Sequence, residues 1–202
     1  MPAKEGRYHH GDLKTALDDA AIEVIVERGV RGFSLAEASR RLGVTTAAPY
    51  RHFADRDALL AAVATRGVGV FADMLAETVA AEEDPARRLA AAAGTYVWFA
   101  ARQRPLFDAI YNSGLDKTRY PEFQSALEAV DALLTFVVEV CDGDEAAADA
   151  LVNAVEASSH GHAMLLLDGV YGEGDEAVEA TAAKATATAR ALIVGREALL
   201  GA

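Results

Sequence analysis

Residues 34–53 read SLAEASRRLGVTTAAPYRHF, and this stretch predicts two short helices joined by a tight turn. Ser34 followed three residues later by Glu37 forms a capping box, in which each side chain is expected to bond the backbone N–H of the other residue. The first helix then ends at Gly43, and the second covers residues 46–53. Two short helices joined in this way make a helix-turn-helix unit.

Helical patterns continue on both sides of this unit. Apolar residues recur at positions i, i+3 and i+4 over residues 13–25, and Gly11-Asp12 is expected to cap the helix that they form. Asp55 is placed to cap a long helix over residues 56–82. Five more helices are expected, over residues 85–103, 105–113, 121–142, 144–168 and 175–200. The chain is therefore predicted to be all-α, with about nine helices.

The composition of the 202 residues agrees with a helical protein and excludes several other classes. Alanine, the best helix former, occurs 45 times. The single cysteine, Cys141, cannot form a disulfide within the chain. The longest uncharged apolar run, residues 89–101, is too short to span a bilayer, and the N-terminus lacks the apolar segment of a secretion signal. We therefore expect a soluble, cytoplasmic protein without membrane contact.

The formal charge of −12 is unevenly distributed along the chain. Residues 1–56 carry nine Lys and Arg against eight Asp and Glu, which gives +1, whereas residues 57–202 carry ten against twenty-three, which gives −13. Polyanions such as DNA repel a body this acidic, so only the first part is expected to approach one. This asymmetry favours two domains, 1–56 and 57–202.

Five short blocks with fixed spacing surround the helix-turn-helix unit. They are HGDL at 10–13, RG at 28–29, FSL at 33–35, LGVT at 42–45 and AAPYRHF at 47–53, and DRDALL follows at 55–60. From Tyr8 to Leu60 the chain resembles the N-terminal DNA-binding domain of TetR-family transcriptional regulators. The resemblance implies a DNA-binding domain at 1–56, followed by a helical ligand-binding and dimerisation domain at 57–202.

Small and hydrogen-bonding side chains at the start of the second short helix suit the DNA major groove. Thr46 and Ala47 let the backbone approach base edges, and Thr45, as the helix cap, presents free amides to a phosphate. Arg56 lies in the first turn of a helix, where a cation opposes the helix dipole, so an external anion such as a DNA phosphate is expected beside it. The resemblance implies that Tyr50 and His52 bind the DNA backbone. The predicted DNA-binding residues are Ser34, Thr45, Thr46, Ala47, Tyr50, Arg51, His52 and Arg56.

A looser resemblance covers the second domain. AGTYVWFA at 93–100, RPLF at 104–107 and HGHA at 160–163 resemble a TetR subgroup named for its Trp-His-Gly motif, although Glu156 stands where that motif has tryptophan. The family implies a pocket for an unknown small-molecule effector, and the few charges in these segments favour an apolar or weakly polar one. Aromatic residues at helical spacing are often core, so only two or three candidates are expected to line a cavity. The candidates are Phe71, Met74, Trp98, Phe107, Tyr111, Phe136, His160 and Met164.

The last two helices are the predicted dimer surface. The final helix carries two stripes of small residues, and short side chains allow helix axes to come close. One stripe is Ala177, Ala180, Ala183, Ala187 and Ala191, and the other is Val178, Ala182, Ala185, Ala189 and Leu192. A single helix lying on its own core is the alternative. A two-fold dimer would read a palindrome, which favours a homodimer with a four-helix interface.

The sequence thus favours a ligand-responsive transcriptional regulator, a repressor that binds a palindromic double-stranded DNA operator and is released by an effector. One alternative is a helical ligand-binding module that does not bind DNA. Another is a small α-helical enzyme, because Glu156, His160 and His162 lie close together in sequence. Glu156 and His160 are ordinary i, i+4 helix neighbours, however, and no phosphate loop, metal motif or nucleophile elbow is found. No catalytic residue, metal site or cofactor is predicted.

Overall fold

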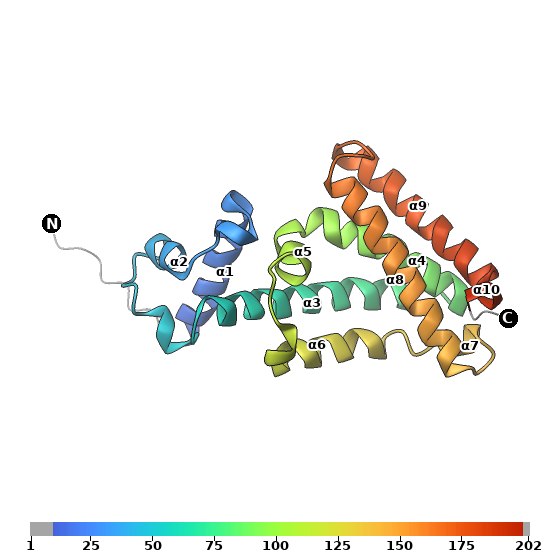
Figure 1. Cartoon of the computed structure of the whole chain (residues 1–202), viewed down its shortest axis with the longest axis horizontal. Coiled ribbons are helices and arrows are strands. Elements are labelled where there is room, and N and C mark those ends of the chain that lie inside the picture. The colour runs from blue at the N-terminus through green and yellow to red at the C-terminus, as the bar shows by residue number, and fades with distance from the viewer. Residues whose placement is uncertain (1–9, 200–202) are drawn as a thin grey trace. The chain divides into compact units, whose positions relative to one another are not determined.

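The computed structural model describes residues 10–199, and all regular structure in that range is helical (Figure 1). The all-α prediction is confirmed. The described part contains ten α-helices and three 3₁₀-helices. The α-helices are α1 (His10–Arg28), α2 (Leu35–Arg41), α3 (Arg56–Ala80), α4 (Pro85–Arg102), α5 (Arg104–Tyr111), α6 (Pro121–Ala132), α7 (Val137–Val140), α8 (Glu145–Leu167), α9 (Gly174–Val194) and α10 (Arg196–Leu199). The 3₁₀-helices are η1 (Val30–Gly32), η2 (Pro49–Arg51) and η3 (Lys117–Arg119).

Packing divides the chain into two compact units. The first contains the described residues up to Gly67 together with Pro105–Gln124, and the second contains Val68–Arg104 and the described residues from Ser125 onward. Gly67 shows why part of α5 belongs to the first unit, because a Cβ atom at this position would lie 3.0 Å from the Ile110 side chain. This division differs from the boundary that we predicted after residue 56.

The first unit has a core of apolar side chains from α1, α2 and α3. Leu17, Val24 and Leu59 are completely buried, and Phe53, just after η2, is 5% exposed. By length and composition α3 is the one described helix that could cross a membrane, and 44% of its most apolar window is buried inside the protein. A single helix of this kind is weak evidence for a membrane span.

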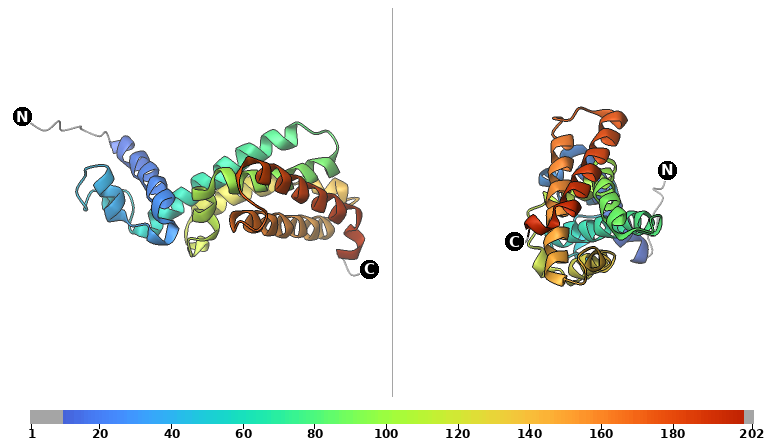
Figure 2. Two further views of the ribbon diagram at one scale, coloured as in Figure 1. Left: turned by 90° about the horizontal axis from the view of Figure 1, so that it is seen from above. Right: turned by 90° about the vertical axis from the view of Figure 1, so that its right-hand side faces the viewer.

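The second unit is built around α4. This helix packs against both α8 and α9, which also lie side by side (Figure 2). Most of its residues between Leu89 and Ala100 are buried, as expected for a helix that is apolar on all sides. Asp84 and Asp144 cap α4 and α8 through their side chains, which accept the N–H groups of residues 87 and 147. Cys141 is buried after α7, and burial raises the pKa of its thiol.

Three helix predictions were wrong in detail. Gly11 and Asp12 lie inside α1 and do not precede it. The helix expected over 121–142 is broken after α6, where the N–H groups of residues 133, 134 and 137 bond carbonyls three residues earlier. The last helix is interrupted at Gly195, which caps α9 by donating its N–H to the Ala191 carbonyl.

Close approach of α4 and α9 depends on Gly94. A Cβ atom at Gly94 would lie 2.7 Å from the Thr186 hydroxyl oxygen, whereas a Cβ atom at Gly69 in α3 would meet nothing within 4 Å. Helix propensity favours alanine over glycine by roughly 1 kcal/mol, so Gly69→Ala is expected to stabilise the protein by up to that amount. Gly94→Ala is expected to lower the free energy of unfolding by about 1 kcal/mol, because overpacking outweighs the propensity gain.

Urea denaturation of the two variants measures this difference. Thr186→Ala removes the obstructing hydroxyl, so Gly94→Ala is expected to be better tolerated in that background. A stabilising Gly94→Ala in otherwise wild-type protein would contradict the expected close contact.

Candidate functional site

Ion pairs join α2 to α1. The Ser34 side chain caps α2 by accepting the Glu37 N–H at 3.2 Å. The Glu37 carboxylate is buried and pairs with Arg28 at 3.2 Å and with Arg40. Only half of the predicted capping box is therefore present, because two guanidinium groups bind the acid that was expected to bond the Ser34 backbone. Arg41 adds ion pairs from α2 to two glutamates of α1.

The predicted second helix over residues 46–53 is wrong. The segment is a turn followed by η2, a single 3₁₀ turn. The Ala48 N–H bonds the Thr45 carbonyl at 3.0 Å, but Pro49 has no N–H with which to continue an α-helix. The His52 and Phe53 N–H groups then share the Pro49 carbonyl, each at 2.9 Å.

This short segment is anchored on one side and open on the other. Pro49 and Phe53 are buried, whereas Tyr50 is 60% exposed and Arg51 is also exposed. His52 is half-buried, and its Nε2 atom is buried without a hydrogen-bond partner among the described residues. The remaining predicted contacts are at the surface, namely Ser34, Thr45, Thr46 and Ala47.

Arg56 has partners within the protein. Its Nε atom donates to the Phe33 carbonyl at 3.0 Å, Nη2 donates to the Val30 carbonyl at 2.9 Å, and Nη1 pairs with Asp57 at 2.9 Å. Our expectation that Arg56 needs an external anion was therefore wrong in its premise. Backbone carbonyls and a neighbouring carboxylate compensate the unfavourable position of this cation at a helix N-terminus.

Most arginines of the first unit form ion pairs with acidic residues of the protein. Between His10 and Gly67, only Arg31 and Arg51 make no ion pair with a described residue, because the other five arginines bind Asp or Glu. Arg51 lies in η2, between the exposed Tyr50 and the half-buried His52. The exposed segment therefore carries one positive charge that no described acid neutralises.

The predicted effector residues fall in both units. Phe107 and Tyr111 lie in the first unit, with their rings tilted relative to one another and the centroids 4.8 Å apart. The other six are half-buried in the second unit: Phe71, Met74, Trp98, Phe136, His160 and Met164. Two of them engage arginines, because Arg102 lies over Trp98 and Arg88 over Phe136.

Tyr96 is a further polar group here, and the sequence reasoning missed it. Its hydroxyl lies 2.9 Å from Nδ1 of His160, and its ring meets Phe71 edge-on at 5.6 Å. The aromatic run around Trp98 contained the signal, since a buried tyrosine usually finds a hydrogen-bond partner. Tyr96 thus connects two predicted effector residues, Phe71 and His160.

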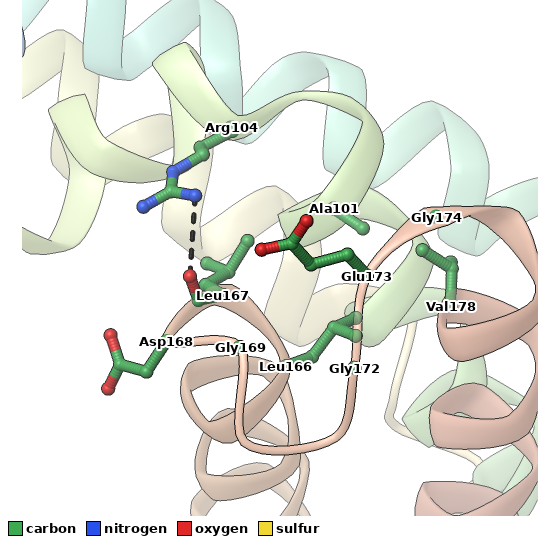
Figure 3. A pocket seen from close by; sticks show the side chains of 10 residues that line it. All are labelled: Ala101, Arg104, Leu166, Leu167, Asp168, Gly169, Gly172, Glu173, Gly174 and Val178. Carbon is green, nitrogen blue, oxygen red and sulfur yellow. Dashed lines mark hydrogen bonds between the residues drawn. The ribbon is translucent and has the colours of Figure 1, made fainter.

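A cavity of about 340 Å³ lies where the end of α4 meets the loop between α8 and α9 (Figure 3). Arg104 stands at its rim and donates to the Leu167 carbonyl at 3.4 Å. Figure 3 shows the Glu173 side chain directed into the cavity and the Asp168 carboxylate directed away from it. None of the eight predicted effector residues lines this cavity.

Two family models match the chain. The model described as bacterial regulatory proteins of the tetR family matches residues 17–63, and the model of the tetracyclin repressor-like C-terminal domain matches residues 89–189. The second match alone spans half of the chain. The chain belongs to the tetR family. No curated relative matches it.

Solved structures support the tetR-family fold. A protein with unknown function from Rhodococcus sp. RHA1 has a TM-score of 0.73 and 32% identity, over 93% of this chain and 98% of that one. A bacterial regulatory protein of the tetR family from Rhodococcus RHA1 has a TM-score of 0.69 and 15% identity, over 89% and 96% of the two chains. FadR from Bacillus subtilis, solved with stearoyl-CoA, has a TM-score of 0.65 and 16% identity, over 89% and 97%.

Members of the tetR family are transcriptional regulators, and the matched models and named regulators are not enzymes. Among the described residues, no group of three or more His, Cys, Asp and Glu could hold a metal ion. The matched C-terminal model is tetracyclin repressor-like, so membership of the Trp-His-Gly subgroup stays a prediction.

His162, in the HGHA segment, joins α8 to α9 in this tetR-family chain. Its Nε2 atom lies 3.0 Å from the Thr188 hydroxyl, which itself donates to the Lys184 carbonyl at 2.9 Å. With the hydroxyl proton on the Lys184 carbonyl, Nε2–H donates to Thr188; Nδ1 is buried without a partner among the described residues. Burial, and then the charge of Lys184, lower the pKa of His162.

We expect His162 to make stability depend on pH. A lowered pKa in the folded state means that the unfolded chain takes up the proton first. The contribution is therefore complete above about pH 6.5 and is lost as the pH falls from there toward the folded pKa. Urea denaturation at pH 7.5 and 5.5 is expected to show a larger loss for wild type than for His162→Gln, by at most about 1.4 kcal/mol per pH unit. Equal losses in both proteins would contradict this assignment.

Proposed function

We propose that this tetR-family regulator is a cytoplasmic repressor that binds a palindromic operator as a homodimer and is released by a small-molecule effector. One observation supports the proposed DNA binding. The segment from Thr45 to His52 is held by the buried Pro49 and Phe53 while it exposes Tyr50 and Arg51, and Arg51 makes no ion pair with a described residue. An exposed and anchored segment of this kind fits a groove without rearranging the core.

The proposed contacts divide by chemistry. Thr46 and Ala47 are short enough for base edges, where a hydroxyl can bond several bases and a methyl group can meet a thymine methyl. Ser34, Thr45, Tyr50 and His52 are proposed to bind phosphate oxygens, and Arg51 supplies a positive charge. Five of the seven arginines between His10 and Gly67 are neutralised internally, so non-specific attraction is expected to be modest.

Duplexes that the wild-type protein selects from a randomised pool provide the operator probe. Failure to enrich any sequence would favour the alternative, a helical ligand-binding module without DNA binding. Tyr50→Ala is expected to lower operator affinity at least about tenfold per folded molecule, because a hydrogen bond to a charged phosphate is lost. Fluorescence anisotropy measures the affinity.

Val26→Ala is the matched control for Tyr50→Ala. Val26 is 66% exposed on α1 and Tyr50 is 60% exposed on η2, so both changes truncate an exposed side chain of the same unit, and only Tyr50→Ala removes a hydroxyl. Val26→Ala is expected to bind the operator like wild type. Wild-type affinity in a folded Tyr50→Ala variant would refute the assignment of this segment to DNA.

The proposed dimer uses the outer faces of α8 and α9. The α9 residues Ala180, Ala183, Ala187 and Ala191 are exposed, whereas Ala182, Ala185 and Ala189 are buried. Along α8, Ala157, Gly161 and Leu165 form a second exposed line at i, i+4 spacing. The predicted stripe with Ala182, Ala185 and Ala189 thus faces the chain's own core. The other stripe is open to a partner from Ala180 onward, whereas its first residue, Ala177, is buried.

Ala187→Glu is expected to convert the dimer to monomer, because the interface would have to bury an unpaired carboxylate. Ala132→Glu, at an exposed alanine of α6, is the matched control and is expected to leave the assembly unchanged. Sedimentation velocity measures the oligomeric state. A dimer that survives Ala187→Glu would remove α9 from the interface.

The effector is proposed to be apolar or weakly polar and to bind among the half-buried aromatic and methionine residues of the second unit. FadR from Bacillus subtilis was solved with stearoyl-CoA, so long-chain acyl compounds are a reasonable first class of probe. Effector and operator would weaken one another's binding by the same factor, since coupling between two sites is reciprocal.

A further inference from the structure

Arg56 is the first residue of α3, but its guanidinium binds a different part of the first unit. Two of its nitrogens donate to the carbonyls of Val30 and Phe33, at 2.9 and 3.0 Å. Both carbonyls belong to the connection between α1 and α2, and the guanidinium also lies 5.7 Å from the centre of the Phe33 ring. The start of α3 is therefore attached to the segment that leads into α2.

The charge of Arg56 is already neutralised in part. Its third nitrogen pairs with Asp57 at 2.9 Å, and all three nitrogens thus have partners in the protein. A DNA phosphate would add to this arrangement less than it would add to Arg51, which is exposed and makes no ion pair with a described residue. The two arginines therefore have different roles.

We propose that Arg56 is a positioning residue that fixes α2 and the Thr45–His52 segment relative to α3, and does not act through its charge on DNA. This inference rests on the proposed DNA-binding function. The guanidinium is suited to the role because its planar fork can donate from separate nitrogens at once. Lysine keeps the charge but offers a single nitrogen, so it can replace a phosphate contact better than it can replace the two carbonyl bonds.

Arg56→Lys separates the two roles on the duplex selected by wild type. The positioning role predicts that operator affinity falls at least about tenfold per folded molecule, with an unchanged slope of log K against log salt concentration. Affinity for a random duplex of the same length is expected to stay at the wild-type value, because the charge is retained. Normalising to the folded fraction removes any effect of reduced stability alone.

Arg56→Gln and Arg51→Gln form a second, matched pair, since each removes one positive charge. Arg51→Gln is expected to reduce the salt slope by about one, and Arg56→Gln is expected to leave it unchanged. Wild-type operator affinity in Arg56→Lys, or a reduced slope in Arg56→Gln, would overturn the proposal and restore a phosphate contact.

Hydrogen exchange without DNA tests the same contact independently of the proposed function. Amides of residues 30–35 and of the first turn of α3 are expected to exchange at least about tenfold faster in Arg56→Gln, because two hydrogen bonds to a charged donor are lost. Arg31→Gln is the control, since Arg31 is exposed in the same connection and makes no ion pair with a described residue. Unchanged exchange in Arg56→Gln would reject the positioning role even if no operator were found.

Discussion

Pro49 determines the form of the surface that is proposed to meet DNA. Because it has no N–H, the chain cannot continue an α-helix from the turn at Thr45, and the backbone closes into a single 3₁₀ turn instead. The proline ring is buried together with Phe53, which leaves Tyr50 and Arg51 outside. A segment this short has few hydrogen bonds of its own. Its geometry depends on the helices beneath it, and therefore on the ion pairs and carbonyl contacts that hold them.

Those contacts explain how a nearly neutral unit can be assigned to a polyanion. Glu37 binds Arg28 of α1, which joins the two helices, and Arg40 within α2, so both arginines are engaged inside the unit. Arg56 is similarly engaged with backbone carbonyls. The arginines of this unit mainly organise it, and little uncompensated charge is left for long-range attraction. Recognition of DNA would then depend on shape and on a few directed contacts, so misplacing these contacts would weaken DNA binding.

The sequence predicted most of the fold because capping and periodicity are local. The helices expected over 85–103 and 144–168 correspond to α4 and α8, and α4 is buried on nearly all sides. The errors arose where a neighbour in space decides. Glu37 binds Arg28 of α1 in place of the Ser34 backbone, and periodicity does not show this contact.

In the candidate site, too, local features could be predicted and contacts between distant residues could not. The exposed segment could be located from the spacing of its blocks, but the partners of Arg56 lie 23 and 26 positions earlier in the chain and no local pattern indicates them. The Tyr96–His160 pair spans 64 positions and was missed for the same reason.

The burial of Cys141 limits how the protein can react with oxidants and electrophiles. Cys141 is the only cysteine in the sequence, it is buried after α7, and burial raises the pKa of its thiol. Peroxides and electrophiles react with thiolates, and a buried, protonated sulfur offers them little to attack. Thiol oxidation therefore has no ready point of entry in this chain, and a thiol-directed label would need a cysteine introduced at the surface.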